Sequence, residues 1–136
     1  MADNLPDAME TILLDYFLHT TGSTTWAAPA SLWVGLCSAA PTETVTNECT
    51  VANNYNRVQI GFSPAVAGQA TGPSAVATFS SASGSWGTIN GYIICEASIG
   101  SAGSNWLAYG AVSPTVAVTT NDTVSFATGA MSLTFA

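Results

Sequence analysis

The segment Ser31–Ser38 constrains the fold of this chain more than any other stretch of its sequence. Two sets of side chains alternate along it, Leu32, Val34 and Leu36 in one set and Trp33, Gly35 and Cys37 in the other. A two-residue period of this kind predicts a β-strand. Because neither set is charged, neither face needs water, and we expect packing on both sides of the strand. One side should face the main core, and the other should lie under a helix or a neighbouring subunit.

The composition indicates one domain whose surface is covered by other subunits. A chain of 136 residues can form one domain with a sizeable core. Charged residues are only 7% of it, whereas about 25% is usual in soluble proteins. Disorder is not expected at 48% hydrophobic content, and no apolar run approaches the ~20 residues of a membrane span. A weakly charged surface favours self-association, so we expect a homo-oligomeric assembly subunit without membrane contact.

The charge is strongly acidic, with eight Asp and Glu residues against the single basic residue Arg57. Binding to phosphates depends on Lys and Arg, so direct nucleic-acid binding is not expected. Four of the acids lie near the N-terminus: Asp3, Asp7, Glu10 and Asp15. They form either a solvated helix face or an acidic contact to a basic partner surface.

Residues 5–18 are predicted to form a short amphipathic helix. Their apolar side chains recur at steps of three and four: Leu5, Met9, Ile12, Leu13, Tyr16 and Phe17. Such a helix is too short to be stable alone in water. It must therefore cap the β-domain or dock on another chain. We assign residues 1–24 to an N-terminal helical arm and residues 25–136 to a β-sandwich domain.

The remainder of the chain has the pattern of an all-β protein. Further strands are predicted at 57–62, 75–79, 86–97, 106–112, 114–118, 123–127 and 131–135. Residues 43–55 form the longest irregular stretch, with a turn at Asn53 and Asn54, and 64–73 is predicted to be a loop of small residues. Short strands spaced by Gly, Ser and Asn turns favour an antiparallel β-sandwich or jelly roll. The predicted fold class is therefore all-β with a short N-terminal α-helix.

The sequence offers little for catalysis. The only histidine, His19, lies in the predicted helix region, away from any nucleophile motif. The carboxylates outside the first 16 residues are scattered over a loop, a strand end and a turn. A glycosidase would need two of them placed together. No Gly-rich phosphate loop is followed by a helix. We therefore expect a protein that is not an enzyme and has no catalytic residues.

The cysteines do not indicate a metal or a disulfide framework. Their number is odd, and Cys37, Cys49 and Cys95 form no CxxC pair. Zinc needs about four clustered nitrogen or sulfur ligands. Cys37 and Cys95 lie in strand patterns and are interpreted as small buried apolar residues. We expect no metal site and no cofactor.

Arg57 and the tryptophans are the residues most suited to a contact. A lone cation on an acidic subunit should find a carboxylate, either within the fold or across an interface. Trp26, Trp86 and Trp106 lie in or beside loops, where such rings can stack on sugars, anchor an interface or pack at the end of the sandwich.

The chain resembles a family of small virion proteins of tailed phages, and the resemblance covers nearly its whole length. It rests on ordered motifs: Met1–Leu5, Leu13–Asp15, Leu32–Leu36, Ser38–Glu43, Tyr55 with Arg57, Ala77–Phe79, Trp86–Ile89, and Leu107 with Tyr109–Ala111. Relatives of this type are labelled tail-fibre or minor structural proteins, and some similar proteins act as capsid cement. The resemblance implies a virion structural protein.

The small size, without a repetitive shaft or a large receptor domain, favours cement over a tail fibre. The expected function is then that of a capsid cement, or decoration, protein. It would bind the major capsid protein as a trimer on the outer surface of the head, after assembly in the host cytoplasm. The alternative is a small tail-fibre or receptor- or glycan-binding protein that uses Trp86, Trp106 and Tyr109. The predicted interface residues are Asp3, Asp7, Glu10, Trp26, Trp33, Glu43 and Arg57.

Overall fold

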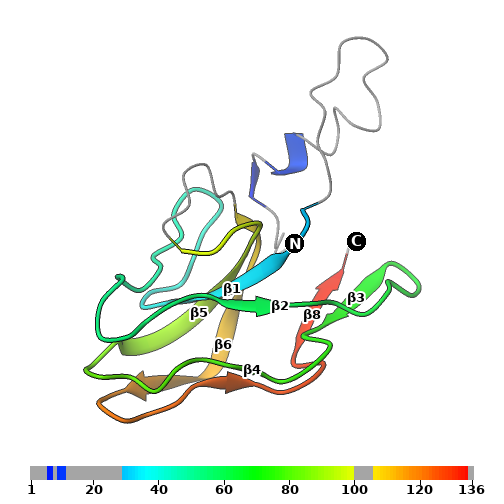
Figure 1. Cartoon of the computed structure of the whole chain (residues 1–136). Helices are drawn as coiled ribbons and strands as arrows, with labels where there is room; N and C mark the ends of the chain where they lie inside the picture. The colour runs from blue at the N-terminus through cyan, green and yellow to red at the C-terminus, as the bar shows by residue number, and fades with distance from the viewer. Residues whose placement is uncertain (1–5, 8, 12–28, 100–105, 135–136) are drawn as a thin grey trace.

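The computed structural model describes residues 6, 7, 9–11, 29–99 and 106–134 (Figure 1). Within these ranges the chain forms the strands β1 Leu32–Cys37, β2 Val58–Ile60, β3 Gln69–Gly72, β4 Ala77–Thr78, β5 Gly87–Cys95, β6 Trp106–Val118, β7 Ser125–Phe126 and β8 Met131–Thr134. Residues 7 and 9–11 are helical, and the remainder of the predicted helix 5–18 lies outside the described residues. The predicted all-β class is confirmed.

The strands form three antiparallel sheets. The largest has the order β2-β1-β5-β6, so β1 and β5 are its inner strands. The other two are the pairs β3-β8 and β4-β7. All of these pairings are antiparallel, as the turn-rich sequence predicts. The jelly-roll topology and the domain boundary at residue 24 stay predictions.

The strand β1 is apolar on both faces, as its alternation predicts. On one face, Val34 and Leu36 join Ile94 of β5 in the main core, which also takes side chains from the two small sheets. On the other face, Cys37 joins two buried residues of β5 in a second cluster, against which three half-buried rings pack: Trp33, Trp106 and Tyr109. Aromatic rings fill the centre of the main core, where Tyr55, Phe79 and Trp86 contact one another.

Two predictions about strands were wrong. Residues 64–73 contain β3, whose small and polar residues carry no alternation because only its pairing with β8 orders it. Residues 106–112 and 114–118 are one strand, β6, which continues through Pro114. Proline lacks the N–H of a ladder hydrogen bond, but β6 is an edge strand, where this loss is tolerated.

All three cysteines are free and buried, as predicted for Cys37 and Cys95. Burial is the main cause that raises the pKa of Cys49 to about 11 and that of Cys95 to about 12, and it also raises the pKa of Cys37.

We therefore expect the native thiols to react slowly with alkylating reagents. The thiolate is the reactive form, so a pKa near 11 for Cys49 leaves roughly 100-fold less thiolate at pH 8 than an ordinary thiol has. Labelling with iodoacetamide at pH 8, followed by mass spectrometry, should show three modified cysteines in guanidinium chloride and essentially none in native protein. Rapid native labelling of any thiol would contradict this burial.

Candidate interaction surfaces

The first candidate feature is the loop before β2, residues 38–57, which closes the open edge of β1. The strand β2 pairs only with Leu32, Trp33 and Val34, so the later residues of β1 have no strand beside them on that side.

Side chains and backbone of the loop take the place of the missing strand at Leu36. The Leu36 N–H donates to the hydroxyl of Tyr55 at 2.8 Å, and the N–H of Cys49 donates to the Leu36 carbonyl at 2.9 Å. The Tyr55 ring is buried in the main core, and burial is the largest cause that raises its pKa.

An ion pair of Glu48 and Arg57 continues this network. Arg57 donates from Nε to Glu48 Oε1 at 2.8 Å and from Nη2 to Glu48 Oε2 at 2.7 Å, and Tyr55 donates to Oε1 at 3.0 Å. The two charged side chains are only 9% and 14% exposed. The hydrogen bond with Glu48 is the largest cause that raises the pKa of Arg57.

Gly35 gives this carboxylate its space on the second face of β1. A Cβ atom at Gly35 would lie 2.5 Å from Glu48 Oε1, closer than real Cβ contacts allow. Arg57 also donates from Nη1 to the carbonyl of Ala97 at 2.9 Å, which ties the loop to the end of β5. The carboxylate that the sequence predicts for Arg57 is thus present within the fold.

The second candidate feature is an apolar groove between β6 and β7. A bulge in β6 forms one wall of the groove. Gly91 pairs with Ala111 and Ile89 pairs with Val116. Residues 112–115 of β6 therefore lie opposite Asn90 alone. β-Bulges redirect side chains in this way and often border functional sites. The groove has a volume of about 420 Å³.

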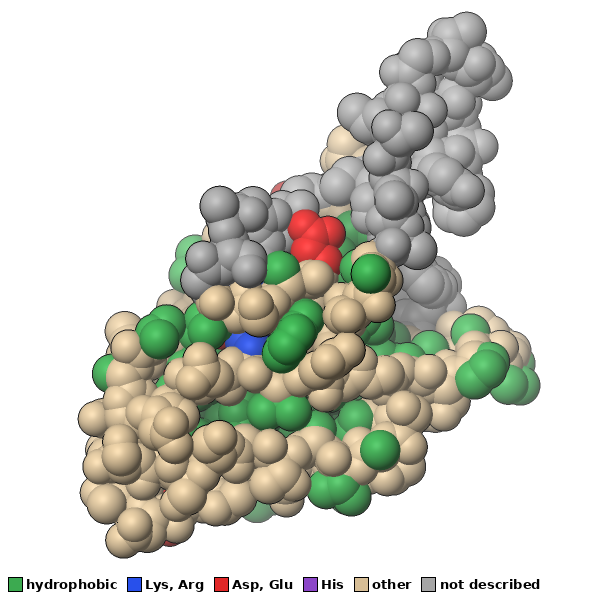
Figure 2. All heavy atoms as spheres, in the orientation of Figure 1, with side chains coloured by type: hydrophobic (Ala, Val, Ile, Leu, Met, Phe, Trp, Pro, Cys, Tyr) green, Lys and Arg blue, Asp and Glu red, His purple; other side chains and the backbone are tan. Residues whose placement is uncertain are grey.

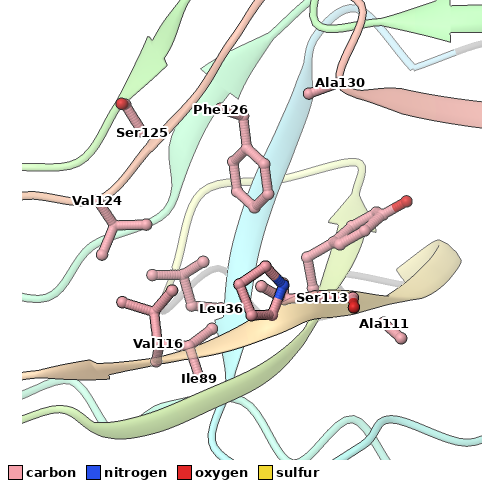
Figure 3. Close-up of a pocket in the computed structure, with 12 residues that line it drawn as sticks. Leu36, Ile89, Ala111, Ser113, Val116, Val124, Ser125, Phe126 and Ala130 are labelled. Carbon is pink, nitrogen blue, oxygen red and sulfur yellow. The ribbon is translucent and has the colours of Figure 1, made fainter.

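The lining of the groove is mostly apolar and carries no charge. It is formed by Leu36, Ile89, Tyr92, Ala111, Val112, Ser113, Pro114, Val116, Val124, Ser125, Phe126 and Ala130. In Figure 3 the Phe126 ring points from β7 toward the segment of β6 that carries Ser113. Its centroid lies 5.7 Å from that of Tyr92, edge to face. A surface of this kind suits an apolar side chain with few polar contacts.

The third candidate feature is an exposed hairpin tip, residues 64–68. Its two arms are joined by backbone hydrogen bonds, and Val66 and Gln69 bond to each other in both directions at 2.8 and 3.0 Å. All five residues of the tip are exposed, and Val66 is 75% exposed. The hairpin projects from the body at the right of Figure 1, and hydrophobic atoms gather at its end in Figure 2.

The three aromatic residues predicted to contact a receptor or glycan differ in their burial. Trp86 is only 8% exposed, and its Nε1 donates to the Asn53 carbonyl at 2.9 Å. Of the alternatives for Trp86, packing in the core is confirmed, and stacking on a glycan is wrong, because its ring is part of the core. Trp106 and Tyr109 are half-buried beside the second cluster. The Trp106 Nε1 is buried and has no hydrogen-bond partner in the described part of the chain.

Five of the predicted interface residues can be placed. Asp7 and Glu43 are exposed, whereas Glu10, Trp33 and Arg57 are half-buried. Asp3 and Trp26 lie outside the described residues. The interface role of all seven stays a prediction.

Sequence reasoning assigned no structural role to Glu48 or Tyr55, and it did not indicate the groove. The lone cation of the chain indicated that a carboxylate partner should exist, but its spacing could not select Glu48 among eight acids. Nothing in the pattern of 106–118 indicated a bulge.

The described ranges contain no cluster of three His, Cys, Asp or Glu side chains able to hold a metal ion. No described helix has the length and apolar character needed to cross a membrane.

Comparison with known families identifies the kind of protein. The family described as "Podophage GP4 fiber I protein gp80" matches residues 4–134. A search of curated proteins finds no match. The matched range includes every strand of the described residues, the ion pair, the groove and the hairpin tip. This chain belongs to the podophage fiber I protein family and is a bacteriophage virion structural protein.

Proposed function

We propose that this chain is a non-catalytic fibre subunit of a podophage virion. The observation that carries the proposal is the match to the fiber I protein family over residues 4–134. This reading corresponds to the tail-fibre alternative of the sequence analysis rather than to capsid cement. Such a subunit works through apolar contacts and hydrogen bonds with other subunits, and it does not need to catalyse a reaction.

The described surfaces support a subunit that works by contact. An ion pair within the subunit joins Glu48 and Arg57, so its one arginine already has a carboxylate partner. An uncharged groove and an exposed apolar hairpin tip are available instead for contacts with other subunits. We propose that the chain is a homo-oligomer in the virion, as its low charge suggests.

Location and copy number in purified virions test the fibre assignment. Gold-labelled antibodies against the protein should mark the fibres, and quantitative mass spectrometry should give few copies relative to the major capsid protein. Label spread evenly over the head, with hundreds of copies per particle, would instead support capsid cement bound to the major capsid protein and would overturn the fibre assignment.

A further inference from the structure

Asn90 is the only asparagine in the sequence that is followed by glycine. In such a pair the glycine nitrogen can attack the carboxamide carbon of asparagine, because no side chain shields that nitrogen. The amide nitrogen then leaves as ammonia, taking the glycine N–H proton with it, and a five-membered succinimide remains. Water opens this ring to aspartate or isoaspartate. The sequence therefore indicates that Asn90 is the asparagine of this chain most prone to deamidation.

The structure fixes the nitrogen that this reaction needs. Gly91 belongs to the inner strand β5, where it pairs with Cys37 of β1 on one side and with Ala111 of β6 on the other. A Cβ atom at Gly91 would lie 2.4 Å from Pro41 Cδ, so the loop before β2 packs directly on this buried backbone. Ring closure requires the chain to rotate between Asn90 and Gly91, and this rotation requires the strand pairing to open.

The carboxamide of Asn90 is held as well. In the register of β1 and β5, Ser38 would lie opposite Asn90, but β1 ends at Cys37. The side chain bridges this gap, because its Nδ2 donates to the Ser38 carbonyl at 2.8 Å and to the Thr88 carbonyl at 3.0 Å. These two bonds match the two donors of a carboxamide. The leaving nitrogen is therefore restrained at the point where the backbone pairing of β1 stops.

We propose that Asn90–Gly91 is a deamidation site that the native fold protects, so that its modification records the unfolding of a subunit. In the folded subunit the ladder at Gly91 and the hydrogen bonds of Asn90 keep the reaction slow. A molecule that unfolds loses both restraints and reacts. The proposal concerns the chemistry of the subunit and does not depend on the fibre role.

Deamidation also changes the fold to which the chain returns. Aspartate at position 90 has no N–H to donate to the carbonyls of Ser38 and Thr88, and its charge would face two acceptors. Isoaspartate would add one atom to the backbone of β5 and disturb its register. A subunit that has unfolded and reacted should therefore refold to a less stable form than an intact subunit.

Peptide mapping by mass spectrometry tests the protection in the full-length protein. Two samples are incubated at the same mildly alkaline pH, one in native buffer and one in concentrated guanidinium chloride. Deamidation at Asn90 should be at least about tenfold slower in the native sample, because an inner strand opens rarely. In the denatured sample Asn90 should react before the matched reference Asn121, which is followed by Asp122.

A urea series separates protection by the fold from an effect of the denaturant itself. The deamidation rate at Asn90 should rise along the unfolding transition measured by circular dichroism, since it follows the population of open molecules. Equal rates in native and denatured samples, or a rate that does not follow the transition, would overturn the proposed protection. Faster reaction of Asn121 in the denatured sample would contradict the choice of Asn90 as the site.

The variant Asn90→Asp tests the effect of the modification on the fold. It should lower the melting temperature by roughly 5 °C through the loss of two carboxamide hydrogen bonds. Asn121→Asp adds the same charge at an exposed turn and should change the melting temperature by less than about 2 °C. Equal stability of the two variants would overturn the proposed restraint by the carboxamide. These experiments use purified subunits, so their outcome is independent of where the protein lies in the virion.

Discussion

Replacing Glu48 by alanine should lower the free energy of unfolding by about 2–4 kcal/mol, because the ion pair is largely but not fully buried and breaking a fully buried pair costs about 3–5 kcal/mol. The change leaves Arg57 at 9% side-chain exposure without its bidentate partner. It also removes an acceptor from the Tyr55 hydroxyl, which organises the open edge of β1. For a chain of this length we expect the melting temperature to fall by roughly 10 °C.

Thermal and urea unfolding, followed by circular dichroism, would measure the Glu48 effect. Glu43→Ala is the matched control, because Glu43 is an exposed carboxylate on the same loop, and its loss should change stability by less than about 0.5 kcal/mol. The double variant Glu48→Leu with Arg57→Met should recover most of the loss, since it leaves no buried charge unpaired. Equal effects of Glu48→Ala and Glu43→Ala would show that the ion pair contributes little.

The second large effect is expected from Phe79→Ala, which should cost about 3–5 kcal/mol. Phe79 is only 1% exposed, and its ring contacts Tyr55, Trp86 and Phe126 at centroid distances of 6.2–6.4 Å. Its removal leaves a cavity where the loop before β2, β5 and the β4-β7 pair meet. Because Phe126 lines the groove, the groove wall should loosen as well.

Urea unfolding compared across three variants would test this assignment. Phe79→Leu should cost less than Phe79→Ala, since it refills part of the cavity. Val76→Ala is the control beside the same strand, and its effect should be small because Val76 is 62% exposed. A Phe79→Ala variant as stable as Val76→Ala would mean that this aromatic cluster does not hold the sheets together.

The sequence predicted the parts of the fold that depend on apolar alternation. The two faces of Leu32–Cys37 follow from side chains that alternate without a charge, and the same pattern identified Val58–Ile60 and Met131–Thr134. Short turns rich in Gly, Ser and Asn predicted antiparallel pairing. Asn53 and Asn54 do adopt the positive φ values that such a turn permits.

Features that depend on contacts between distant segments could not be predicted. Gln69–Gly72 becomes a strand only through its pairing with β8, about sixty residues later in the chain. The bulge of β6 arises from its register against β5, and the groove follows from that bulge. Glu48 meets Arg57 because Gly35 leaves room for its carboxylate, which is a three-dimensional relation.

The closure of β1 at Leu36 has a consequence for assembly at high local concentration. An unpaired strand edge is a template for any passing strand, and proteins that crowd together must protect such edges from aggregation. Here a phenol hydroxyl and one backbone amide occupy the hydrogen-bonding groups of Leu36. The protection comes from the loop's own fold rather than from a lysine or a proline on the edge. Subunits can therefore be concentrated during virion assembly while this part of the sheet stays closed to indiscriminate strand exchange.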